Sequence, residues 1–205
     1  MSPLGSGLHP KCGSLSIVFA AQNTNLELSG QDVDVVVFNQ RANAENVKDY
    51  LVSVNDRFYL VDSTNPRNTY KILYYSISRR PSLGCKVDIL TPGPEVLHIP
   101  RITDDHVLYL DGSDIPVMPF LPLLILKVQG WYDHRRSHRQ DMRQKVPHDV
   151  NNIMELLDMT DKSDRLNHFN WLPDWFIERA YTIIRDFCKK KPSSRSSWRS
   201  LGFDV

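Results

Sequence analysis

An apolar run that carries acids at alternate positions constrains the fold of this chain most. Residues 33–38 are rich in β-branched side chains, as is typical of a buried strand, and aspartates occupy positions 32 and 34. Successive strand side chains point to opposite faces, so Asp32 and Asp34 share one face while Val33 and Val35 point to the other. The pattern predicts a strand with two carboxylates side by side.

A third acid lies in a second strand-like run. Asp88 interrupts the otherwise apolar residues 85–90, where a carboxylate is costly to bury unless it has a partner. A magnesium ion shared with Asp32 and Asp34 would supply one, because magnesium prefers oxygen ligands and usually borrows one or two protein carboxylates. A salt bridge to Lys86 or a position at a sheet edge is the alternative for Asp88. For the first two acids the alternative is simple alternation on a half-exposed strand.

The balance of acidic and basic residues excludes a strong overall electrostatic field around the protein. Lys and Arg number 25 against 24 Asp and Glu, for a net charge of +1, so no overall signal favours a nucleic-acid or membrane partner. Small polar or nucleotide ligands fit this balance better. With 205 residues, 41% of them hydrophobic, the chain can bury a substantial core as one folding unit.

The cysteines and the apolar runs indicate where in the cell the protein is located. Cys12, Cys85 and Cys188 are odd in number and widely spaced, which argues against a disulfide framework and a zinc site. The longest apolar run, residues 117–128, is broken by prolines and a lysine, and the start of the chain has no basic segment followed by a long apolar one. We therefore expect a soluble intracellular protein of the cytoplasm, with the nucleus as the alternative.

Hydrophobic periodicity predicts an α+β fold with a mixed or antiparallel sheet in the N-terminal half, flanked by helices, and a helical C-terminal half. Residues 15–21 have the length of a helix or a buried strand, and we favour a short helix that begins near Gly13 and Ser14. The remaining expected elements are a helix over 42–54, strands over 58–61, 70–77 and 85–90, an irregular or hairpin stretch over 107–117, and helices over 119–136, 148–159 and 173–187.

Four segments follow from this pattern. They are a flexible N-terminus (1–12), an α/β core (13–118), a helical part of the same unit (119–188) and a basic, Ser-rich tail (189–205). The tail has no helical or strand period, so we expect it to fray.

The order of the motifs resembles the nucleotidyltransferase superfamily typified by DNA polymerase β. In that superfamily a Gly-Ser pair precedes a strand with two carboxylates, and a later strand supplies a third. The matching positions here are Gly13, Ser14, Asp32, Asp34 and Asp88. Glycine permits close backbone approach, and a helix N-terminus favours an anion such as a triphosphate.

A closer resemblance covers nearly the whole chain. It is to a mainly fungal set of nucleotidyltransferase-like proteins related to minimal nucleotidyltransferases of the abortive-infection toxin type, and the matching stretches are DVDVVV, FYLVDSTNPRNTYKILYYSI, CKVDIL, IPVMPFLPLLILKVQGWYDHR and KVPHDVNNIMELL. The resemblance implies that Lys127 and Lys145 face nucleotide phosphates, with Asp149 near the start of the same helix as Lys145. Taken alone, Lys127 could instead reach the surface from an apolar helix, and Lys145 could be a solvated loop lysine.

The resemblance implies a polymerase β-like fold and transfer of a nucleoside monophosphate from a nucleoside triphosphate to a hydroxyl acceptor, with Mg²⁺ or Mn²⁺ as cofactor and release of pyrophosphate. Asp32, Asp34 and Asp88 would be the catalytic and metal-binding residues, and Gly13 and Ser14 would hold the triphosphate tail. The acceptor is open among a protein, an RNA and a small molecule. The alternative functions are a catalytically inactive nucleotide-binding or protein-interaction module and a toxin-like activity.

Three histidines suggest a weaker hypothesis. His134 and His138 lie four positions apart and would share a helix face, and His148 follows, so a metal site can be imagined. The arginines around them oppose a bound cation, which favours a solvated charged face.

Overall fold

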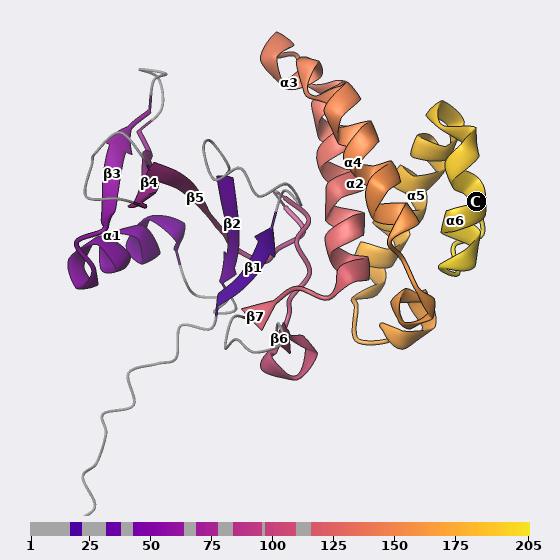
Figure 1. The fold of residues 1–205 in the computed structure, drawn as a ribbon, viewed down its shortest axis with the longest axis horizontal. Helices are drawn as coiled ribbons and strands as arrows, with labels where there is room; N and C mark the ends of the chain where they lie inside the picture. The colour runs from indigo at the N-terminus through magenta and orange to yellow at the C-terminus, as the bar shows by residue number, and fades with distance from the viewer. Residues whose placement is uncertain are drawn as a thin grey trace, which may run out of the picture.

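A computed structural model describes residues 17–21, 32–37, 43–63, 69–77, 84–95, 97–109 and 116–205, with no side-chain description at 17–21 and 32. Figure 1 shows a sheet in the N-terminal half and a bundle of helices in the C-terminal half. The α+β class predicted from the sequence is confirmed.

Seven strands form one mixed sheet within the described residues, in the order β3-β4-β5-β2-β1-β7-β6. The central pair, β2 and β5, is parallel, as is the pair β1 and β7, while the other neighbours are antiparallel. The strands are β1 (Ile17–Ala21), β2 (Asp32–Val37), β3 (Phe58–Asp62), β4 (Lys71–Ser76), β5 (Gly84–Leu90), β6 (Leu108–Tyr109) and β7 (Pro116–Val117).

Strand β1 corrects the expectation of a helix over residues 15–21. Its five residues pair antiparallel with β2 from Ile17↔Val37 to Ala21↔Val33, and parallel with β7 at Phe19↔Val117. A continuous apolar run presents no polar helical face, and a place between two strands satisfies the backbone on both edges. Gly13 and Ser14, where the helix was expected to begin, lie outside the described residues.

Helix α1 (Ala44–Val54) covers one face of the sheet. Asn43 caps it, because its side-chain oxygen accepts a hydrogen bond of 2.8 Å from the backbone N–H of Glu45. Val47 of α1 packs against buried residues from alternate positions of the central strands, which are Val35, Val37, Leu73, Val87 and Ile89. The acids of β2 and β5 lie at the intervening positions and therefore face away from α1.

The opposite face of the sheet meets the first turns of α2 (Phe120–Arg136). Val36 from β2, Ile99 and Ile102 from the connecting segment and Met118 form a small buried cluster there. Leu123 and Leu126 of α2 pack against this cluster. The contact fixes α2 beside the face of the sheet that carries the acids.

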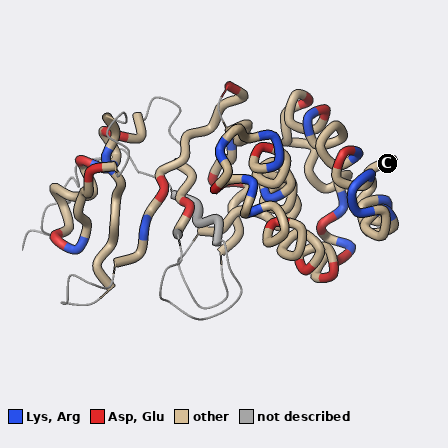
Figure 2. Tube along the Cα trace, turned by 90° about the horizontal axis from the view of Figure 1, so that it is seen from above, with Lys and Arg blue, Asp and Glu red and all other residues tan. Residues whose placement is uncertain are grey.

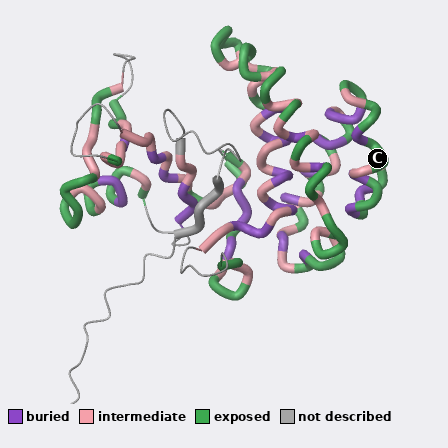
Figure 3. The backbone as a smooth tube through the Cα atoms, viewed as in Figure 1, coloured by how far each residue is buried: buried purple, intermediate pink, exposed green. Residues whose placement is uncertain are grey.

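The helical half has its own core, seen as the buried stretches in Figure 3. Trp131 of α2 and Phe187 of α5 meet edge to face with their ring centroids 5.0 Å apart. The elements are α3 (Gln140–Gln144), α4 (Val146–Asp158), α5 (Asp174–Lys190), α6 (Arg195–Ser200) and the 3₁₀ turns η1 (Asp104–His106), η2 (Lys162–Asp164), η3 (Leu166–His168) and η4 (Pro192–Ser194).

The C-terminal tail is folded, and the expectation that residues 189–205 fray is wrong. Helix α5 continues to Lys190, and the turn η4 and helix α6 follow it. Trp198 and Phe203 are fully buried, and they pack edge to face at 5.8 Å. Widely spaced apolar side chains thus anchor a segment whose local sequence shows no periodicity.

No helix within the described residues combines the length and the apolar character needed to cross a membrane.

Candidate functional site

Asp34 and Asp88 lie side by side on the two central strands. They are register partners in the parallel pair β2·β5, so their Cα atoms are about 4.8 Å apart and their side chains share one face of the sheet. Both residues are half-buried. The sequence indicated each acid separately, and the topology of the sheet brings them together.

Asp32 begins strand β2, and its register partner on β5 is Lys86. Its side chain is outside the described part of the structure. The ammonium of Lys86 contacts Asp88, with Nζ 2.5 Å from Oδ2. The ion pair that the sequence offered as an alternative for Asp88 is therefore present. The other alternative, an edge position, is wrong because β5 lies between β4 and β2.

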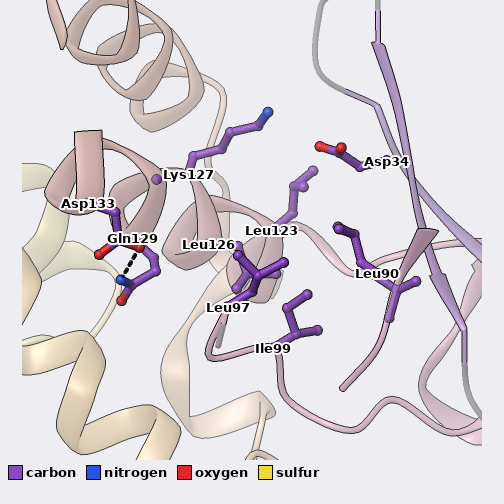
Figure 4. Close-up of a pocket in the computed structure, with 11 residues that line it drawn as sticks. Asp34, Leu90, Leu97, Ile99, Leu123, Leu126, Lys127, Gln129 and Asp133 are labelled. Carbon is purple, nitrogen blue, oxygen red and sulfur yellow. Dashed lines mark hydrogen bonds between the residues drawn. The ribbon is translucent and has the colours of Figure 1, made fainter. Parts of the chain in front are cut away.

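Lys127 approaches the acids from helix α2. Figure 4 shows its side chain extending toward the carboxylate of Asp34, across a small cavity with leucine and isoleucine side chains at its base. Burial lowers the pKa of the Lys127 ammonium below its ordinary value, while the nearby carboxylates of Asp34 and Asp149 act to raise it. Lys127 therefore lies within electrostatic reach of an acid on the sheet and an acid on α4.

Two cavities adjoin each other at Lys127. The first, of about 140 Å³, lies between the sheet and α2, and Asp34 and Lys127 are on its wall. The second, of about 450 Å³, is lined by α2, α4 and the segment between them, including Lys127, His134, Lys145, His148 and Asp149. Lys127 and Lys145, predicted separately to face phosphates, thus border one cavity. Lys145 is exposed, at the junction of α3 and α4.

His134 belongs to a helix-to-helix contact that the sequence analysis missed. Its Nδ1 lies 2.8 Å from Oδ2 of Asp149, which ties α2 to α4. The expectation that His134 and His138 share a helix face is wrong, because α2 ends at Arg136. The sequence carries no signal for the contact with Asp149, since the two residues meet only through tertiary packing.

The carboxylates of the site fit a hard divalent cation. Asp34 and Asp88 offer oxygen donors from adjacent strands, the donor type that magnesium prefers. Among the side chains that the structure describes, no group of three His, Cys, Asp or Glu residues is close enough to hold a metal. Asp32, the third member of the predicted set, is not among those side chains.

Charges of both signs lie where the sheet meets the helices. Figure 2 shows acidic and basic positions on the strands in the middle of the molecule, and acidic and basic positions on the helices beside them.

Among solved structures, the fold is similar to the crystal structure of an antigenic nucleotidyltransferase-like protein from Paracoccidioides brasiliensis. The TM-score is 0.56, and the match covers 91% of this chain and 85% of that chain at 16% sequence identity. The chain therefore has a nucleotidyltransferase-like fold. No family model matches the sequence, and no curated protein matches it.

Proposed function

We propose that this chain is a metal-dependent nucleotidyltransferase that moves a nucleoside monophosphate from a nucleoside triphosphate to a hydroxyl acceptor. The observation that carries the proposal is the in-register pair Asp34 and Asp88, of which Asp34 faces Lys127 across the cavity between sheet and helices. Two acids and a cation from the opposite wall are what a magnesium–triphosphate complex requires of its binding site. The nucleotidyltransferase-like fold of the chain supports the same conclusion.

In this proposal the acids divide two tasks. Asp32 and Asp34 hold the magnesium that accompanies the triphosphate, and Asp88 completes the metal site or accepts the proton of the attacking hydroxyl. The metal, when bound, would offset the negative charge of the phosphates and of the departing pyrophosphate. The acceptor oxygen bonds to the α-phosphorus while the bond from that phosphorus to the bridging oxygen breaks, and pyrophosphate leaves with the bonding electrons.

The basic residues would hold the phosphates. Lys127 extends into the gap beside Asp34, and Lys145 borders the larger cavity next to it. Gly13 and Ser14, which precede the described part of the sheet, are proposed to hold the triphosphate tail through backbone N–H groups.

Thermal melting with each of the four nucleoside triphosphates, with and without magnesium, tests the proposal. A ligand that binds the native state must raise its stability, so the correct nucleotide is expected to raise the Tm of the wild type when magnesium is present. The double variant Asp32→Asn/Asp34→Asn should lose this shift. The matched control Asp56→Asn changes an exposed acid in the turn before β3 and should keep it.

Release of pyrophosphate separates an enzyme from an inactive relative. A magnesium-dependent shift together with pyrophosphate release that Asp88→Asn abolishes would support transfer. A shift without any release would favour the nucleotide-binding module, and no shift with any of the nucleotides would refute the site.

A further inference from the structure

A lysine lies on the same face of the sheet as the acids. Lys86 and Asp88 are two positions apart on β5, so both point toward the face that carries Asp34. The position opposite Lys86 on β2 is Asp32, and the ammonium contacts Asp88 at 2.5 Å. The candidate metal site thus includes a cation of the chain itself, and that cation engages one of the proposed ligands.

This ion pair contributes little to the stability of the fold. The side chains of Lys86 and Asp88 are 29% and 38% exposed, and ion pairs with that access to water add little stability. The lysine stem is flexible, so the ammonium can leave the carboxylate without disturbing the sheet. Lys127 differs, because it comes from the opposite wall and burial lowers its pKa.

We propose that Lys86 is the resident counter-ion of the carboxylate site, and that it makes binding of a free divalent cation weak until a nucleotide arrives. An ammonium at the site repels a free divalent cation and occupies an oxygen of Asp88. A triphosphate brings negative charge that can accept the ammonium, so Lys86 turns from Asp88 to a phosphate oxygen as the metal–nucleotide complex binds. This inference rests on the proposed function, because it takes the three acids as metal ligands.

Manganese binding in the absence of nucleotide tests the role of Lys86 directly. Free Mn²⁺ is measured by electron paramagnetic resonance during titration of the wild type and Lys86→Met. The variant is expected to bind Mn²⁺ about tenfold more tightly, from the Coulomb repulsion between a divalent cation and an ammonium a few ångströms apart in a water-exposed setting. An affinity equal to or weaker than that of the wild type would overturn the proposal.

Two further variants show where the effect arises. Lys71→Met removes the same charge from an exposed position of β4 whose side chain belongs to the α1 face of the sheet, and it should leave the Mn²⁺ affinity unchanged. The double variant Lys86→Met/Asp88→Asn should lose the gain, because Asp88 is the ligand that the lysine releases. An equal gain of Mn²⁺ affinity in Lys71→Met would mean that the effect comes from the net charge of the protein, and it would refute a local role of Lys86. Lys86→Gln is the substitute if Lys86→Met folds poorly.

The manganese titration and the nucleotide melting separate the two proposals. A tighter Mn²⁺ complex in Lys86→Met without any nucleotide-dependent shift in the wild type would support the counter-ion and refute the nucleotidyltransferase. A nucleotide-dependent rise in the Tm of the wild type, together with equal Mn²⁺ affinities of the wild type and Lys86→Met, would support the nucleotidyltransferase and refute the counter-ion role of Lys86.

Discussion

Trp198 tests whether the folded tail is part of the core. Its side chain is fully buried between helix α6 and the rest of the helical half, with Phe203 against its ring. Replacing a buried tryptophan by alanine costs about 3–5 kcal/mol, because it removes apolar contacts and leaves a cavity. In a chain of this size each kcal/mol lowers the Tm by about 2–4 °C, so Trp198→Ala should melt about 6–20 °C below the wild type.

A second substitution at the same position serves as the control. The indole Nε1–H of Trp198 is buried and has no hydrogen-bond partner among the described residues. Trp198→Phe keeps an aromatic ring and removes this polar group, so it should cost roughly half as much as alanine or less. Urea and thermal unfolding of both variants measure the costs. A Trp198→Ala protein that melts within about 2 °C of the wild type would refute a packed tail.

Three further predictions concern the site and the sheet. Burial lowers the pKa of Lys127, so charging it costs more in the native state than in the unfolded state. Lys127→Met should therefore be more stable than the wild type at pH 7, and the difference should shrink as the pH rises through the lowered pKa toward the ordinary value. Urea unfolding at pH 7 and pH 10 checks the sign, and a less stable variant at pH 7 would contradict it. His134→Ala should cost about 1 kcal/mol through the lost contact with Asp149, whereas His134→Asn keeps a donor near the position of Nδ1 and should cost less in chemical denaturation; equal costs would argue against the contact. Gly84→Ala would place a Cβ 2.3 Å from the hydroxyl oxygen of Tyr59. The free energy of unfolding, measured by calorimetry, should therefore fall by about 1–3 kcal/mol. A Tm equal to that of the wild type would mean that the tyrosine moves freely.

Periodic segments could be predicted from the sequence, and segments without a period could not. Strands β2 to β5 and helices α1, α2, α4 and α5 lie close to their predicted ranges, because alternation and helical spacing report burial on one face. Strand β1 was assigned to a helix because a short apolar run fits either structure. The tail was expected to fray because Trp198 and Phe203 stand among serines and basic residues, and only packing against distant helices buries them.

The candidate site was predictable in its parts and not in its arrangement. An acid in an apolar strand is costly, which is why Asp34 and Asp88 stood out. Their in-register pairing depends on the parallel order of β2 and β5, which no local pattern encodes. The ion pair of Lys86 with Asp88 was one of the alternatives that the sequence offered, whereas the contact of His134 with Asp149 follows from tertiary packing alone. The roles of Gly13, Ser14 and the segment boundaries stay predictions.

The place of β5 between β4 and β2 has a consequence for how the protein folds. Asp34 and Asp88 come from strands separated in the chain by α1, β3 and β4, so they meet only after a long loop has closed. Such non-local parallel pairing is slow, whereas the β3–β4 hairpin and the helices depend on local contacts. A nascent chain would therefore have these elements before it has a carboxylate pair. The ability to bind metal would appear late in refolding, when β2 pairs with β5. The time course of metal binding would therefore report on the rate of this pairing.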